Sequence, residues 1–114
     1  MSTFKVDRLL QQLVTALDRL TWHADEQLSY VHDLGVDVDE LALEFDDIHH
    51  LAIGKAQEGL ISDALITTIQ PVDEHLKLMT EMGPSMWTEA AVQDATEWQE
   101  LRNLARSARS HLAT

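Results

Sequence analysis

The chain has 114 residues, which fits one domain over residues 1–114 and is long enough for a modest hydrophobic core. It contains no cysteine, which excludes disulfides, thiolate nucleophiles and thiolate metal ligands. Its formal net charge of −12 disfavours nucleic acid and anionic membranes as direct partners, because both are bound by neutralising phosphates with lysine and arginine.

The chain begins with MSTFKVDRLLQQ, in which Lys5, Asp7 and Arg8 interrupt the apolar residues. No apolar run in this stretch is long enough for a signal peptide or a membrane-spanning helix. We therefore expect a cytoplasmic protein that does not enter a membrane.

A long amphipathic helix is predicted near residues 3–33. At about 100° per residue, one face of this segment collects apolar side chains along its whole length. Gly35 is a candidate C-cap, and Asp37 or Asp39 can N-cap the following helix. The apolar face consists of Val6, Leu9, Leu13, Leu17, Leu20, Ala24, Leu28 and Val31.

The next two helices are predicted near residues 38–58 and 60–82. Their apolar stripes occupy nearly opposite sides of a common helical wheel, and this phase jump past Gly59 marks the break between them. Pro71 interrupts the second of the two segments, but the apolar stripe keeps its phase across it. We predict a continuous helix that is kinked at Pro71; the alternative is two short helices that meet at Gln70.

A last helix is predicted near residues 94–112. Asp94 and Glu97 form a capping-box pattern at its start. The connection before it, residues 83–94, can hold one or two helical turns. Four helices with short connections predict an all-α fold, an antiparallel four-helix bundle whose core two chains could complete by dimerising.

The segment DVDELALEFDDIHH, residues 37–50, carries six carboxylates and two histidines. It does not match a calcium-binding EF-hand loop, because Ala42 and Ile48 stand where glycine and a bidentate glutamate are required. It also lacks the second acid-x-x-His helix of ferritin-like di-metal sites. We interpret the segment as a solvated face whose first acids complement the helix dipole; the alternative is a docking surface for a basic partner.

A metal site built from histidines on three helices is a second hypothesis. If the first two helices run antiparallel about a turn near residues 35–36, His23 and His49 lie at the same height, and His75 lies about 7 Å away along the helix axis. With Asp46 they would offer nitrogen and oxygen ligands to zinc or iron. Apart from such a metal, we expect no cofactor.

Side chains that point away from the predicted core indicate self-association. Trp22 and Phe4 lie opposite the apolar face of the first helix, and large aromatic residues on an outer face are typical of interfaces. Three arginines lie on one side of the last helix, where they can complement the helix dipole or contact an acidic partner. The candidate interface residues are Phe4, Trp22, Ile66, Ile69, Asp37, Asp39, Asp46, Asp47, Arg102, Arg106 and Arg109.

Motifs of common catalytic sites are absent from the sequence. No G-x-S-x-G elbow occurs, and Gly54-Lys55 lacks the other residues of a P-loop. An enzymatic role is therefore disfavoured but stays open. We predict a non-enzymatic, acidic helical module for interaction or regulation, which binds itself as a homodimer or binds another, basic protein. The alternatives are a metal-binding bundle with oxygen or hydrolytic chemistry, and an acidic inhibitor or immunity-type protein that blocks a basic partner.

Overall fold

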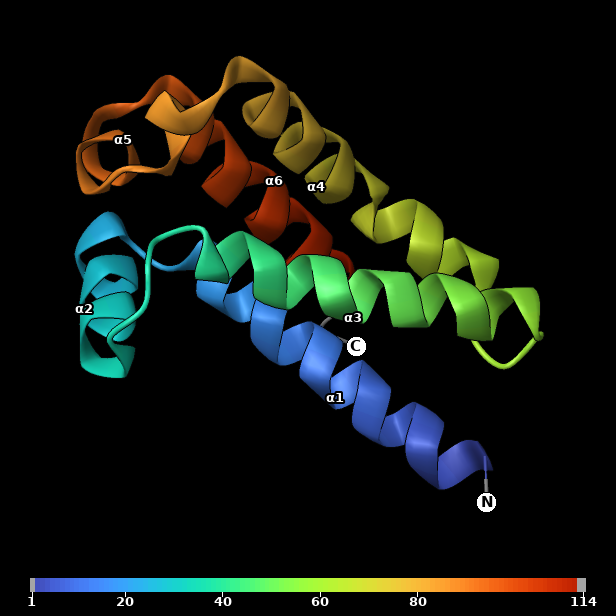
Figure 1. Ribbon diagram of the computed structural model, residues 1–114. Helices are drawn as coiled ribbons and strands as arrows, with labels where there is room; N and C mark the ends of the chain where they lie inside the picture. Colours follow the sequence, from blue (N-terminus) through green and yellow to red (C-terminus); the bar gives the residue numbers. More distant parts are fainter. Residues whose placement is uncertain (1, 113–114) are drawn as a thin grey trace.

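The computed structural model describes the backbone of residues 2–112 and the side chains of residues 6–112 (Figure 1). No strand occurs among these residues, so the all-α prediction is confirmed. No helix in this part of the chain is both long and apolar enough to cross a membrane. In chain order the elements are α1 (Ser2–Thr21), α2 (Ala24–Leu34), α3 (Glu40–Gln57), α4 (Asp63–Met82), the 3₁₀ helix η1 (Pro84–Trp87), α5 (Glu89–Asp94) and α6 (Thr96–Leu112).

The longer helices α1, α3, α4 and α6 form the body of the molecule. α1 packs against α3 and α6, α4 packs against both as well, and the short elements α2, η1 and α5 gather at one end (Figure 1). α1 and α3 run in opposite directions, because Arg19 contacts Glu44 whereas Val6 lies in a cluster with Ala52. A regular antiparallel four-helix bundle, completed by dimerisation, stays a prediction.

The main hydrophobic core receives side chains from all six α-helices. Its largest fully buried side chains include Leu17, Phe45 and Trp98, and burying a large apolar side chain contributes about 1.5–3 kcal/mol. The indole Nε1 of Trp98 donates a hydrogen bond to the carbonyl oxygen of Met86 (2.7 Å), which ties α6 to η1. A smaller cluster joins the start of α1 to the end of α3 and the loop after it; it contains Val6, Leu9, Ala52 and Ile61.

The predicted helix over residues 3–33 is wrong in one respect, because the chain bends at Trp22 and His23. His23 has an extended backbone (φ −65°, ψ 157°) and is the N-cap residue of α2. Its backbone N–H donates to Oε1 of Glu26 (3.3 Å), half of a capping box. α2 ends at Gly35, as predicted, with the left-handed φ of 69° that glycine adopts easily.

The helices predicted near 38–58 and 60–82 correspond to α3 and α4. α3 ends before Gly59, which has a φ of 77°, so the predicted break at this glycine is confirmed. The hydroxyl of Ser62 caps α4 by accepting from the backbone N–H of Ala64 (3.1 Å). α4 stays helical through Pro71, which confirms the continuous helix over two helices that meet at Gln70.

The start of the last helix differs from the prediction. Asp94 is the final residue of α5 and therefore cannot N-cap α6. Instead, the carbonyl oxygen of Ala95 accepts from the backbone N–H groups of Trp98 (3.2 Å) and Gln99 (3.3 Å). The two short helices η1 and α5 confirm that the connection holds helical turns, and Thr88 caps α5 by accepting from the N–H of Ala91 (3.1 Å).

Candidate functional site

Side chains from α2 and α6 hold the bend between α1 and α2. The amide Nε2 of Gln27 donates to the carbonyl oxygens of Arg19 (3.0 Å) and Leu20 (3.3 Å). The guanidinium Nε of Arg106 donates to the carbonyl oxygen of Thr21 (3.1 Å). Because the last carbonyl groups of a helix have no partner within it, these bonds replace those that a continuous helix would supply.

Arg102 supports the bend from inside the molecule. Its Nε donates to Oε1 of Gln27 (3.0 Å), and its Nη2 donates to the carbonyl oxygen of Val92 on α5. The side chain is buried, and burial, followed by the nearby charge of Arg106, lowers the pKa of the guanidinium. This placement contradicts the predicted interface role of Arg102, because its polar atoms serve contacts within the chain.

The bend also brings Trp22 beside the outer side of α2. The rings of Trp22 and Tyr30 meet edge to face, with centroids 5.7 Å apart and planes at 80°. In a straight helix, residues eight positions apart are separated by about 12 Å along the axis. A shallow groove of about 430 Å³ results, which we call the α2 face; it is lined by Trp22, Asp25, Glu26, Ser29, Tyr30 and Asp33.

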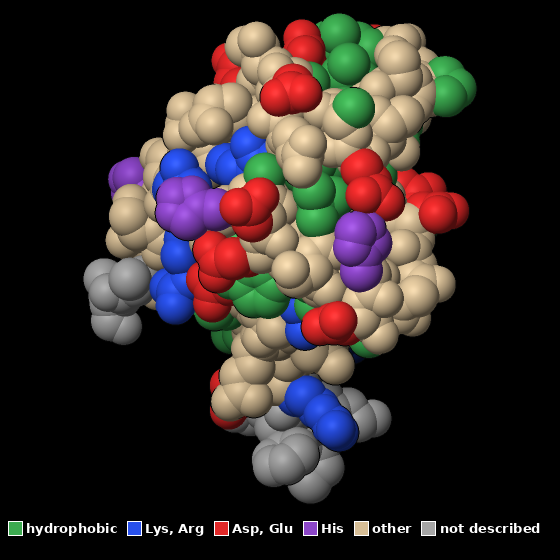
Figure 2. Space-filling view, turned by 90° about the vertical axis from the view of Figure 1, so that its left-hand side faces the viewer, with side chains coloured by type: hydrophobic (Ala, Val, Ile, Leu, Met, Phe, Trp, Pro, Cys, Tyr) green, Lys and Arg blue, Asp and Glu red, His purple; other side chains and the backbone are tan. Residues whose placement is uncertain are grey.

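Three carboxylates of the α2 face accompany the two rings. Asp25, Glu26 and Asp33 are all exposed. Figure 2 looks onto the end of the molecule that carries α2 and α5, and acidic side chains are spread across it. An aromatic face attracts cations, and a neighbouring carboxylate adds an opposite charge. The α2 face therefore has the chemistry to bind a lysine or arginine side chain.

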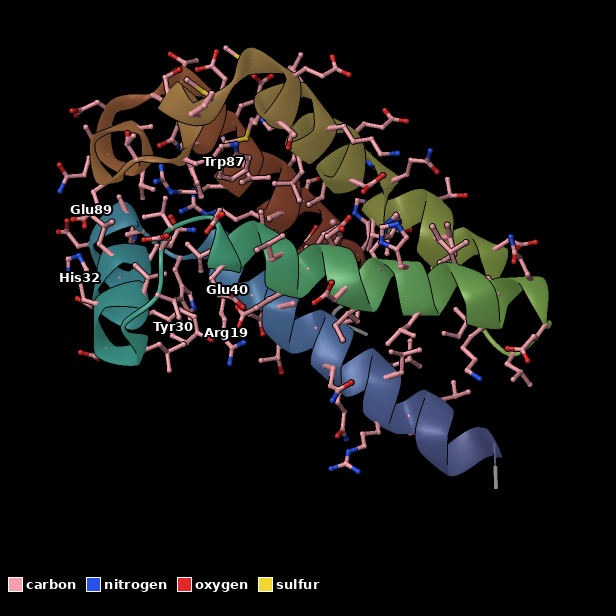
Figure 3. The ribbon with its side chains drawn as sticks, viewed as in Figure 1. Arg19, Tyr30, His32, Glu40, Trp87 and Glu89 are labelled. Carbon is pink, nitrogen blue, oxygen red and sulfur yellow. The ribbon has the colours of Figure 1, made fainter. Side chains whose placement is uncertain are left out.

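Tyr30 is held in place by Glu44 and Arg19. Its hydroxyl donates to Oε2 of Glu44 (2.6 Å), and the same oxygen accepts from Nη1 of Arg19 (3.1 Å). The guanidinium carbon of Arg19 lies 4.6 Å from the centre of the Tyr30 ring, and Figure 3 shows the two side chains together between α2 and the end of α1. Burial first, and then Glu44, raise the pKa of Tyr30 to about 12. The ring is thus a fixed, neutral part of the α2 face.

The ionisation of Tyr30 can be followed alone, because the chain has one tyrosine. We expect a pKa of about 12 in place of 10.0, and a Glu44→Gln variant should lower it toward 10.0 by removing the negative charge beside the hydroxyl. Since the folded chain holds this proton more tightly than the unfolded chain, this contribution to stability is complete below pH 10 and is lost as the pH rises toward 12. The measurement is an ultraviolet absorbance titration, with circular dichroism at each pH to confirm folding. Identical curves for the two proteins would contradict the assigned cause.

His49, a predicted metal ligand, lies buried between α3 and α4. Its Nδ1 is 3.4 Å from Oδ1 of the buried Asp73, whose other oxygen lies 3.2 Å from Nζ of Lys77. The His49 ring stacks on Phe45, with centroids 5.6 Å apart. Burial lowers the pKa of His49, and the charge of Asp73 opposes this effect. The histidine is thus part of the contact between two helices.

The other predicted metal ligands lie elsewhere. His75 donates from Nε2 to the carbonyl oxygen of Glu97 (2.8 Å), and Asp46 pairs with His50 (3.5 Å). His23 is exposed at the bend, so the register that placed it level with the second helix is wrong. Among residues 6–112, no three His, Asp or Glu side chains gather closely enough to hold a metal ion.

The remaining residues of the predicted interface fall into two groups. Asp37 and Asp47 are exposed, while Asp39 and Asp46 are half-buried. Docking of a partner on these acids stays a prediction. Asp39 occupies the N-cap position of α3, one of the two predicted positions, but its backbone is helical and its side chain makes no cap hydrogen bond.

Several predicted interface side chains are used within the chain. Ile69 has no exposed surface, which contradicts its assignment, and Ile66 packs partly buried against the core. Nε of Arg109 donates to Oδ1 of Asp18 (2.7 Å), which joins α6 to α1 as Arg106 does. The side chain of Phe4 lies outside the described residues. Of the aromatic and aliphatic candidates whose side chains are described, Trp22 lines a groove.

Sequence reasoning missed Tyr30, Glu44 and Gln27. Gln27 did carry a signal, because it follows Leu9 by eighteen positions, or five helical turns, and so shares the apolar face. A buried amide on such a face needs hydrogen-bond partners, which the carbonyl groups at the bend provide. Nothing local marked Glu44 as the partner of Tyr30, because the two residues lie on different helices.

No protein-family model matches the chain, and no curated protein or solved structure matches it either. What the protein can bind follows from the geometry and charge of its own residues.

Proposed function

We propose that the protein is a non-enzymatic interaction module whose α2 face binds a basic segment of a partner protein. The observation that carries this proposal is the shared groove of Trp22, Tyr30 and three carboxylates. A lysine or arginine over an aromatic ring gains about 0.5–1 kcal/mol at an exposed site. The net charge of −12 adds long-range attraction that speeds the encounter with a basic partner.

The contacts beneath the α2 face support this role, because they fix its shape before a partner arrives. The hydroxyl of Tyr30 donates to Glu44, which also accepts from Arg19 beneath the ring. At the exposed edge of α2, Nε2 of His32 lies 3.0 Å from Oε2 of Glu89 on α5 (Figure 3). A side chain that is already ordered loses little conformational entropy on binding. A partner can therefore gain affinity from a groove of modest size.

The proposed partner carries lysine or arginine on an exposed, extended or helical segment. An acidic inhibitor that masks the basic surface of another protein is a narrower form of the same role. A homodimer remains part of the proposal, although Ile69, one of its expected contacts, is buried. The metal-dependent alternative has no support from the described residues, in which His23, His49 and His75 are not brought together.

Binding of an arginine-rich peptide tests this role. We expect fluorescence anisotropy of a labelled peptide of alternating arginine and serine to show binding that weakens as salt is added. The double variant Asp25→Asn with Asp33→Asn should weaken binding about tenfold, because two exposed charge interactions are lost. Trp22→Ala should weaken it several-fold through loss of the cation–π contact.

A double variant with the same change of charge serves as the control. Glu81→Gln with Glu100→Gln removes two exposed carboxylates outside the α2 face and should leave the affinity within about twofold. A peptide in which glutamate replaces arginine should not bind. Equal losses for the two double variants would show non-specific attraction to the acidic body and would contradict the assignment of the α2 face.

A further inference from the structure

The bend at Trp22 and His23 has only a weak local signal in the sequence, the capping bond from the N–H of His23 to Glu26. The segment Thr21–Ala24 contains neither proline nor glycine, the residues that break helices most strongly. The last carbonyl groups of α1 accept from side chains: those of Arg19 and Leu20 from Gln27 of α2, and that of Thr21 from Arg106 of α6. Contacts from α2 and α6 therefore add to the local capping bond in holding the bend, in a segment that lacks a strong helix breaker.

The apolar pattern is in phase on both sides of the bend. Leu13, Leu17 and Leu20 of α1 and Leu28 and Val31 of α2 fall on one face of a single helical wheel, and all five are buried. If the chain adopted only the bent conformation, the apolar faces of α1 and α2 would not have to fall on the same side of a single helical wheel. A straight helix over residues 2–34 would present one continuous apolar side.

Straightening would exchange one set of hydrogen bonds for another. In a continuous helix, the carbonyl groups of Arg19, Leu20 and Thr21 would accept from the N–H groups four residues further on, in place of the side chains of Gln27 and Arg106. The bent and the straight segment therefore satisfy these three carbonyl groups about equally well. The larger loss would be the packing of α1 on α3 and α6, unless a second chain supplied those two helices.

We propose that the Trp22–His23 bend is a hinge through which two copies of this chain exchange α1. In the exchanged dimer, residues 2–34 form one straight helix, and α1 of each copy packs on α3 and α6 of the other. The Arg19–Glu44 and Asp18–Arg109 pairs then form between chains with unchanged partners. Such exchange of an identical element is a low-cost route to a symmetric dimer. Trp22 and Tyr30 separate in the straight helix, so this inference does not rest on the proposed role of the α2 face, which belongs to the bent chain.

Two substitutions at His23 are expected to shift the equilibrium between the bent and the straight conformation in opposite directions. His23→Pro fits the observed φ of −65° and cannot lie inside a straight helix, although it removes the exposed N–H bond to Glu26; His23→Ala is a poor N-cap and the best helix former. Because each dimer has two hinges, we expect His23→Ala to raise the dimer association constant about tenfold and His23→Pro to remove the dimer. Light scattering during size exclusion at several concentrations measures both, and circular dichroism checks folding. An unchanged dimer in His23→Pro, or no dimer in His23→Ala, would overturn the hinge.

A charge exchange shows whether α1 crosses between chains. One His23→Ala chain carries Asp18→Arg and a second carries Arg109→Asp, so each chain alone places like charges where Asp18 and Arg109 pair. Only in an exchanged heterodimer do both positions bring opposite charges together. Native mass spectrometry of the mixture should therefore show heterodimers above their statistical share. A statistical distribution would mean that the chains associate through another surface, and the inference would be wrong.

Discussion

Replacing Trp98 with alanine is expected to lower the free energy of unfolding by about 3–5 kcal/mol, the usual range for removing a fully buried tryptophan. The indole has no exposed surface and meets the ring of Trp87 edge to face, with centroids 5.7 Å apart. Its loss leaves a cavity where α6 meets η1 and also removes the hydrogen bond to Met86. Urea denaturation followed by circular dichroism measures the change.

Trp98→Phe separates the packing of the indole from its hydrogen bond. Phenylalanine keeps an aromatic ring in the core and most of the packing, but it lacks the second ring of the indole and has no N–H to donate to the carbonyl oxygen of Met86, so we expect a loss of about 1–2 kcal/mol. If alanine and phenylalanine destabilised the protein equally, the hydrogen bond and not the packing would dominate. A loss below 1 kcal/mol for alanine would contradict the burial of Trp98.

Arg102→Ala has the second-largest expected effect, a loss of about 3 kcal/mol of unfolding free energy. The substitution removes two hydrogen bonds from a charged donor, each contributing about 1.5–3 kcal/mol, and leaves Gln27 Oε1 and the Val92 carbonyl oxygen without this donor. Loss of the packed side chain adds to the effect. Thermal and urea unfolding measure it, and chain association should be checked, because Gln27 also holds the hinge.

Arg109→Ala is the matched control for Arg102. It removes the same side chain from the same helix, but Arg109 and its partner Asp18 are both partly exposed, with 32% and 42% of their side-chain surface accessible. Exposed pairs contribute about 0–1 kcal/mol, so a small loss is expected. Equal losses at the two positions would show that Arg102 gains nothing from its buried partners.

Local patterns predicted most of the helical structure. The phase jump after Gly59 separated α3 from α4, and the unbroken stripe across Pro71 predicted one helix there, because both signals come from the spacing of apolar residues along the segment itself. The capping pattern at Asp94 was misleading, since α5 continues through that residue and Ala95 precedes α6 instead. Helix ends depend on a few weak interactions that compete with neighbouring turns.

The predicted metal site was wrong because it depended on how two whole helices align, which no local pattern fixes. Its register assumed a straight first helix, which would place Arg19 level with Ala52, whereas Arg19 contacts Glu44. The bend shifts α1 along α3 and leaves His23 exposed at one end. One wrong assumption about helix length thus moved every expected contact between the two helices.

By itself, the sequence determined that the protein is all-helical and acidic, and it determined which faces of most helices are buried, because periodicity and charge are properties of neighbouring residues. The tertiary structure alone decided that the chain bends at Trp22, that Arg102 turns inward and that Tyr30 meets Glu44. These features depend on hydrogen bonds between groups far apart in the chain, Arg102 and Gln27 being 75 residues apart. Helical periodicity says which side of a helix is buried, but the partner that a buried polar group finds is set by how the helices pack.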